Sequence, residues 1–356
     1  MIERGTHRAP CVGMAPPCAE RERRARLVCA LFTLACIPLT WGCEPTEGSV
    51  TCVRSRDCPA AFPSCFCDGR CHSAIGGAVD GGTAAGPTTQ AFVLFPLLWD
   101  TPSADQAHGL NLDARVDGPA NQCTGELDYV SPTTGEPGVD DDLALVTPTL
   151  ESLLPDGWEG GFRDATEAGE AAVALEITED GASRVVHAWL VAFADAPQFP
   201  RADDVCSAIT AQSSCVPPCA WTARAGACSG IAPGQSWRRL SDLGAVSATR
   251  IGRRLSTSTR LRSVTLTPTV TGGPQPFALH EVGLEADLCG DRLERGELGG
   301  ALSVTDAQAW VDAVFHPSID VHTVLLPDLT PSADGLTCAD ISVGVGFAGV
   351  PSVLVP

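Results

Sequence analysis

The chain has 356 residues, of which 36 are glycine, 28 are proline and only 5% are aromatic, a turn-rich composition that favours strands and loops over helical bundles. Its 23 basic residues are all arginine, so chemistry that depends on a Schiff-base, P-loop or general-base lysine is excluded. The net charge is −20, and it becomes −23 from Cys43 onward because residues 1–42 hold six arginines and three glutamates. Such an acidic chain is not expected to bind nucleic acid through its phosphates.

Residues 1–42 are predicted to be a signal peptide. A basic segment at 20–26 precedes an uncharged apolar run at 27–41, which is short for a membrane span but has the length of a signal core. Gly42 and Cys43 follow directly, and this arrangement resembles a bacterial lipoprotein signal. The resemblance implies that Cys43 receives a lipid, becomes the new N-terminus and contacts the membrane.

Two alternatives to lipidation remain open. Thr40 and Trp41 differ from the residues usual before a lipidated cysteine, so ordinary cleavage nearby is the first alternative. Arg23–Arg24 allows a twin-arginine signal as the second. Every version predicts export, and Glu44 after the cysteine favours the outer membrane or cell surface.

Beyond Cys43, the chain contains twelve cysteines, an even number that is sufficient for six disulfides in an oxidising compartment. Residues 43–72 are predicted to form the lipidated N-terminus and a small cysteine-rich module. A second group at 206–228 resembles small modules of the plexin-repeat type, inserted in a loop of the main domain. A zinc site is the alternative for the first cluster. The predicted disulfide cysteines are Cys52, Cys58, Cys65, Cys67, Cys71, Cys123, Cys206, Cys215, Cys219, Cys228, Cys289 and Cys338.

A flexible linker is predicted at 73–90, followed by a β-rich domain at 91–356. Apolar residues alternate with small or polar residues at 263–270 and 340–347, which predicts half-buried strands. Residues 184–193 are apolar on both faces and predict a central strand. Short strands separated by Gly/Pro turns favour a β-sandwich or jelly roll.

One or two short helices are expected in this domain. Residues 306–315 carry Trp310, Val311, Val314 and Phe315 on one face, with Thr305 and Gln308 in capping-box register. Residues 141–153 form the second candidate. Both helices are short, so the fold class remains mainly β.

The stretch 109–144 resembles uncharacterised cysteine-rich lipoproteins of the bacterial cell envelope that have a β-rich domain. The residues that carry this resemblance are Cys123, Asp128, Ser131, Pro132, Gly135, Gly138, Val139 and Asp140. Asp141 stands where the group has asparagine. The resemblance implies an envelope location and a β-rich fold, and it implies no activity.

The sharpest candidate for a metal site is acidic: Asp128, Asp140, Asp141 and Asp142. Neighbouring carboxylates suit Ca²⁺, which takes six to eight oxygen ligands. The alternative is that Asp142 caps the following helix while its neighbours are solvated. No Gly-x-Ser-x-Gly, His-Glu-x-x-His or P-loop motif occurs, which removes the commonest hydrolase, zincin and NTPase mechanisms.

These features favour a non-enzymatic surface protein that binds a glycan or another envelope protein. Two alternatives stay open. One is a secreted hydrolase for glycans or esters on a jelly-roll scaffold, using carboxylates such as Asp128 and Asp140. The other is a purely structural envelope protein.

Overall fold

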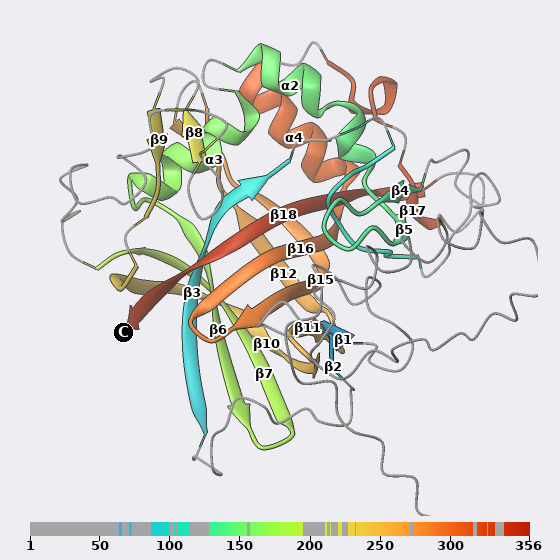
Figure 1. Cartoon of the computed structure of the whole chain (residues 1–356). Helices are drawn as coiled ribbons and strands as arrows, with labels where there is room; N and C mark the ends of the chain where they lie inside the picture. Colours follow the sequence, from blue (N-terminus) through green and yellow to red (C-terminus); the bar gives the residue numbers. More distant parts are fainter. Residues whose placement is uncertain are drawn as a thin grey trace, which may run out of the picture.

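A computed structural model gives the architecture of the main domain and parts of the cysteine-rich segments (Figure 1). The structure describes residues 64–65, 71–72, 87–99, 103, 105–113, 128–154, 157–194, 211, 214, 220–222, 227–231, 233–270, 273–315, 319–325, 327–331 and 338–356. The predicted signal peptide and residues 73–86 of the predicted linker lie outside this set. Strand β3 begins at Thr88, so the β-rich domain starts before the predicted boundary at 91.

The fold is mainly β, as predicted, and is built on one large sheet. Its strands run in the order β11-β10-β7-β6-β3-β18-β16-β15-β12, with β17 paired to β18. The strands are β3 (Thr88–Leu98), β6 (Ala172–Asp180), β7 (Ser183–Phe193), β10 (Gln235–Ile251), β11 (Arg254–Thr257), β12 (Leu261–Leu266), β15 (Phe277–Cys289), β16 (Arg292–Ser303), β17 (Leu329–Pro331) and β18 (Cys338–Val355).

The sheet folds over on itself, and this is how it encloses a sandwich-like core. Strand β11 pairs with β10 on one side and with β15 on the other, so distant parts of the sheet meet. The start of β10 also pairs in parallel with the end of β18, at Gln235 and Ser352. Four small ribbons accompany it: β1 (Ser64–Cys65) with β2 (Cys71–His72), β4 (Tyr129–Val130) with β5 (Pro137–Val139), β8 (Ala220–Thr222) with β9 (Ala227–Ser229), and β13 (Thr269–Val270) with β14 (Gly273–Pro274).

Apolar residues are buried on both faces of several strands. The predicted central strand at 184–193 is β7, and its Val186 lies in the main core while Val191 lies in a second cluster around Trp237. The strand predicted at 340–347 lies within β18, and Val343 and Val345 of its apolar face are fully buried in the main core. The strand is not half-buried as predicted, because Ser342, Gly344 and Gly346 on its other face are buried too.

The α-helices of the described residues lie together at one end of the sheet (Figure 1). They are α2 (Thr147–Leu153), α3 (Trp158–Glu167) and α4 (Val304–Phe315), with 3-10 turns η3 (Asp142–Leu145) and η5 (Val321–Thr323) beside them. The helix predicted at 141–153 is thus split into η3 and α2. Helix α3 was not predicted, because Gly160 and Gly161 have low helix propensity. A Cβ at Gly161 would lie 2.6 Å from the Thr269 carbonyl oxygen, so the glycine allows α3 to approach β13 closely.

Candidate functional site

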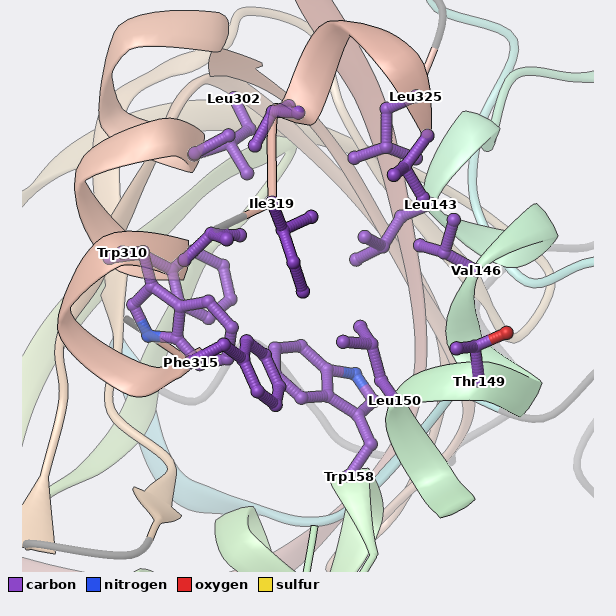
Figure 2. Close-up of a pocket in the computed structure, with 15 residues that line it drawn as sticks. Leu143, Val146, Thr149, Leu150, Trp158, Leu302, Trp310, Phe315, Ile319 and Leu325 are labelled. Atoms are coloured by element: carbon purple, nitrogen blue, oxygen red, sulfur yellow. The ribbon is translucent and has the colours of Figure 1, made fainter. Parts of the chain in front are cut away.

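An apolar cavity of about 160 Å³ lies between the helices and the end of the sheet (Figure 2). Its described lining side chains are apolar apart from Thr149, and none is charged. Thr149 and Val324 are exposed lining residues, so the cavity reaches the surface beside them. The lining residues are Leu143, Val146, Thr149, Leu150, Trp158, Phe277, Leu302, Ala307, Trp310, Val311, Phe315, Ile319, Val321, Val324 and Leu325.

Helix α4 forms one wall of the cavity. The sequence analysis predicted this helix but assigned its N-terminal cap to the wrong residue. The Ser303 hydroxyl accepts the amide hydrogen of Asp306 at 3.0 Å and donates to its carboxylate, so Ser303 caps the helix and the predicted capping box at Thr305 is wrong. Gln308 instead donates to the Ile319 carbonyl and accepts from the Val321 amide, both at 2.9 Å. These two bonds fix the 319–321 segment, which forms the adjacent wall.

The opposite wall is held by a capping carboxylate. Glu151, in α2, accepts the amide hydrogens of Trp158 and Glu159 at 2.5 and 3.2 Å and so caps the start of α3. Glu159 in turn accepts the amide hydrogen of Trp99 at 2.7 Å. The two helices are thereby tied to each other and to the end of β3.

An aromatic cluster supports the cavity. Trp158 packs edge-on against Trp310 with ring centroids 5.2 Å apart and stacks on Phe277 at 6.0 Å. Phe162 and Trp99 extend the cluster, and their rings are stacked with centroids 4.9 Å apart. Large rings that support one another in this way give the cavity a rigid wall.

The predicted acidic cluster lies close to this region, at a gap in the sheet beside β18. On this edge of β18, between its pairings with β17 and with β3, the amides of Ser342 and Gly344 face none of the described strands. Asp328 accepts the Ser342 amide hydrogen at 2.5 Å, and Asp141 accepts that of Gly344 at 3.1 Å. Buried carboxylates thus replace the missing strand as hydrogen-bond acceptors.

Burial raises the pKa of three of these carboxyls. It raises the pKa of Asp328 to about 7 and that of Asp140 to about 6, with further contributions from neighbouring carboxylates. It raises the pKa of Asp141 well above its usual range. Asp142 is the chain neighbour of the lining residue Leu143, and Asp328 lies three positions after the lining residue Leu325.

The predicted calcium set does not form a metal site. Asp140, Asp141 and Asp142 are buried, but Asp140 accepts the amides of Leu112 and Asp113, just as Asp141 accepts that of Gly344. Across the described ranges, no three His, Cys, Asp or Glu side chains are placed to hold a metal ion, and that includes Asp128 with the other three. The alternative was also wrong, because Asp142 is the first residue of η3, Val146 is the N-cap of α2, and Asp140 and Asp141 are buried rather than solvated.

Glycines on β18 explain why the 107–112 segment can lie across the sheet. A Cβ at Gly344 would be 1.8 Å from the His108 carbonyl oxygen, and one at Gly346 would be 2.5 Å from the His108 ring. The segment 107–112 therefore packs directly on the Ser/Gly face of the predicted strand 340–347. Sequence alternation showed that these positions avoid the apolar face, but it could not show what covers them.

A second, polar cleft of about 300 Å³ lies beyond this segment. Hydroxyl groups from Ser256, Thr257, Ser258 and Thr259 line it, together with Asn111, Arg260, Glu136, Glu285 and Glu297. At its floor the Ser131 hydroxyl donates to buried Glu297 at 2.5 Å, and Arg254 lies 3.5 Å from the same carboxylate. The structure thus places Ser131 at this cleft, and the sequence analysis predicted no role for this residue.

The contacts of Ser131 do not match a hydrolase triad. In such a triad a histidine lies between the serine and the carboxylate. Here Ser131 bonds directly to Glu297, while His108 Nδ1 is 3.9 Å from that carboxylate. Ser131 also accepts the amide hydrogens of Thr133 and Thr134, as a turn residue does.

The predicted cysteine framework is described only in part. Cys71, Cys228, Cys289 and Cys338 are disulfide-bonded, and Cys65 is described only as part of β1. The remaining predicted disulfide residues and Cys43 lie outside the described residues. Those residues are Cys52, Cys58, Cys67, Cys123, Cys206, Cys215 and Cys219.

No protein-family model, curated protein or solved structure matches this chain. The resemblance to envelope lipoproteins therefore stays a prediction. Of the helices that the structure describes, none is long and apolar enough to cross a membrane. The predicted signal core at 27–41 lies outside those residues.

Proposed function

We propose that this protein is a non-enzymatic binding protein of the bacterial cell envelope that holds a small apolar ligand in the cavity between α2, α4 and η5. The observation that carries this proposal is the cavity itself. Its volume of about 160 Å³ is similar to that of apolar cavities that bind benzene. Small-molecule sites are generally concave, apolar and few in a protein.

The surroundings of the cavity support binding more than catalysis. No charged side chain is among the described lining residues, so the cavity has no general acid or base to offer from them. The lining residue Val324 is 46% exposed, and Leu145, the chain neighbour of the lining residue Val146, is 55% exposed. An apolar rim favours the entry of an apolar molecule.

Location and attachment follow from the N-terminal sequence. In this proposal residues 1–42 direct export, Cys43 carries a lipid that anchors the chain in the outer membrane or at the cell surface, and up to six disulfides brace the small modules and the main domain. A purely structural role and a glycan or ester hydrolase remain the competing functions. Neither competitor accounts for an apolar cavity that opens at the surface.

The cavity proposal is tested by filling the cavity. Ala307→Leu in α4 adds apolar volume at a lining position, whereas Ala309→Leu makes the same change on the exposed side of that helix. In calorimetric titration, we expect the full-length protein and Ala309→Leu to bind benzene or toluene, and Ala307→Leu to bind at least tenfold more weakly. Absence of binding to the unmodified protein would refute the proposal.

A second candidate function, glycan binding, is favoured by the polar cleft. Its hydroxyl, amide and carboxylate groups match the hydrogen-bonding needs of a sugar. Ser258→Trp would block the cleft, and Ser183→Trp at the exposed first residue of β7 is the control. On a glycan array we expect binding by the unmodified protein and the control, with loss in Ser258→Trp. Equal binding by all three would remove the cleft from consideration.

A further inference from the structure

The apolar cavity between α2, α4 and η5 presents almost no hydrogen-bonding atoms to a ligand, because its surface is formed almost wholly by carbon atoms. The indole N–H of Trp310 donates to the Gln275 carbonyl, and the indole nitrogen of Trp158 is buried and does not face the cavity. Figure 2 shows the hydroxyl oxygen of Thr149 directed away from the centre of the cavity. A polar group placed inside would therefore lose its hydration without replacement, which is unfavourable.

A ligand that has a polar end must leave that end at the opening of the cavity. The exposed lining residues mark this opening, since Thr149 belongs to α2 and Val324 directly follows η5. Only the hydrocarbon part of such a ligand would enter. The cavity volume of about 160 Å³ suits a hydrocarbon group of about six to eight carbons, because a cavity of about 150 Å³ holds benzene.

An exposed acidic residue lies near each of the two residues that mark the opening. Glu151 is exposed and lies two positions after Thr149. Asp320 is also exposed, and it belongs to the same turn as Val324. The amide and the hydroxyl of Thr323 donate to the Asp320 carbonyl at 2.9 and 2.7 Å, which fixes this turn. Two carboxylates therefore flank the place where the polar end of a ligand would lie.

The charges around the rest of the cavity have the same sign. Among the described residues, the Arg, Asp and Glu chain neighbours of the lining residues are all acidic. They are Asp142, Glu151, Glu159, Asp306, Asp312 and Asp320. The whole chain has a net charge of −20. The electrostatic potential at the opening therefore repels an anionic group and attracts a cationic one.

We infer that the ligand is an amphiphile whose hydrocarbon part fills the cavity, while its positively charged end, such as an ammonium group, stays in water at the opening. This rests on the proposed function of the cavity and specifies its ligand class. Burial of the hydrocarbon part would supply most of the affinity, about fourfold in Kd for each buried CH₂ group. The carboxylates at the opening would select the sign of the charge.

Three probes that share one heptyl chain test the choice of charge at pH 7. Heptylammonium is cationic, 1-heptanol is neutral and octanoate is anionic. In calorimetric titration of the full-length protein at an ionic strength of about 0.01 M, we expect heptylammonium to bind about tenfold more tightly than octanoate, with heptanol between them. At about 1 M salt the three Kd values should agree within about twofold, because charges at the opening are then screened. Octanoate binding as tightly as heptylammonium at low ionic strength would overturn the inference.

Asp320→Asn removes one charge at the opening and leaves the cavity lining and the Asp320 carbonyl in place. At low ionic strength we expect it to reduce the preference for heptylammonium over octanoate about threefold. Asp291→Asn is the matched control, because Asp291 is exposed in the turn before β16, whereas α4 follows the other end of that strand. The control should change the preference by less than about 1.5-fold. Equal preferences in the two variants would contradict the position proposed for the charged end.

Ala307→Leu shows whether the heptyl chain occupies the cavity. We expect this variant to bind heptylammonium at least about tenfold more weakly, because the added side chain takes the space of the ligand. Unchanged binding would mean that the cation adsorbs to the acidic surface, and it would overturn the inference. Binding of benzene without binding of heptylammonium would also overturn it, and would leave the cavity proposal standing. If neither benzene nor any heptyl probe binds the unmodified protein, both proposals are wrong.

Discussion

Asp328 offers a direct test of the buried carboxylates beside β18. This side chain is 4% exposed, and it accepts the amide hydrogen of Ser342 at 2.5 Å. Burial, together with repulsion from Asp142 and Asp140, raises its pKa from 3.8 to about 7, although the hydrogen bonds from Ser342 act in the opposite direction. Asp328→Asn removes the charge but keeps an oxygen that can accept the same hydrogen bond.

The direction of the effect follows from the two pKa values. The folded protein holds the Asp328 proton more tightly than the unfolded chain does, so this group stabilises the fold most below about pH 4. That stability is lost as the pH rises through about 7. A difference of about three pKa units corresponds to roughly 4 kcal/mol in the free energy of unfolding.

The assay is urea unfolding of the full-length protein at pH values from 4 to 8. We expect Asp328→Asn to be close to the unmodified protein at pH 4 and more stable by up to about 4 kcal/mol at pH 8. Asp291→Asn, in the exposed turn between β15 and β16, serves as the control for the loss of one carboxylate. The reasoning is refuted if Asp328→Asn follows the same pH dependence as the unmodified protein, or is the less stable protein at pH 8.

Two further predictions concern the β18 surface and the N-terminus. Gly344→Ala should lower the free energy of unfolding by about 3 kcal/mol or more, because its Cβ would lie 1.8 Å from the His108 backbone oxygen. Urea unfolding measures this, and a loss below about 1 kcal/mol would contradict the close approach. Mass spectrometry of the N-terminus of the protein isolated from its native membranes should show a mature chain that begins with acylated Cys43. An unmodified peptide spanning residues 40–46 would exclude lipidation.

The sequence predicted the mainly β fold from features that act locally. Alternation at 340–347 and the apolar run at 184–193 identify buried strand faces, because successive side chains on a strand point to opposite sides. The apolar face of the helix at 306–315 was also predicted, and Trp310, Val311 and Phe315 of that face line the cavity. These patterns depend on near neighbours in the chain, and so they are readable without the fold.

Two other elements, β16 and α3, could not be predicted from the sequence because of their glycine content. Strand β16 contains Gly296, Gly299 and Gly300, which reduce its strand propensity. The structure shows a long-range reason for one of them, since a Cβ at Gly299 would be 3.0 Å from the Leu110 side chain. Helix α3 was hidden in the same way, because Gly161 serves a contact with β13.

The sequence alone thus determined the apolar faces, the strand-rich character and the expectation of export from the residues before Cys43. Only the tertiary structure decided the function of the acidic residues and the position of the cavity. Asp141 accepts a hydrogen bond from Gly344, which lies 203 positions away in the chain. Spacing in the sequence therefore could not distinguish this role of Asp141 from that of a calcium ligand. The cavity likewise collects residues from 143 to 325, because a concave site forms where segments converge in space.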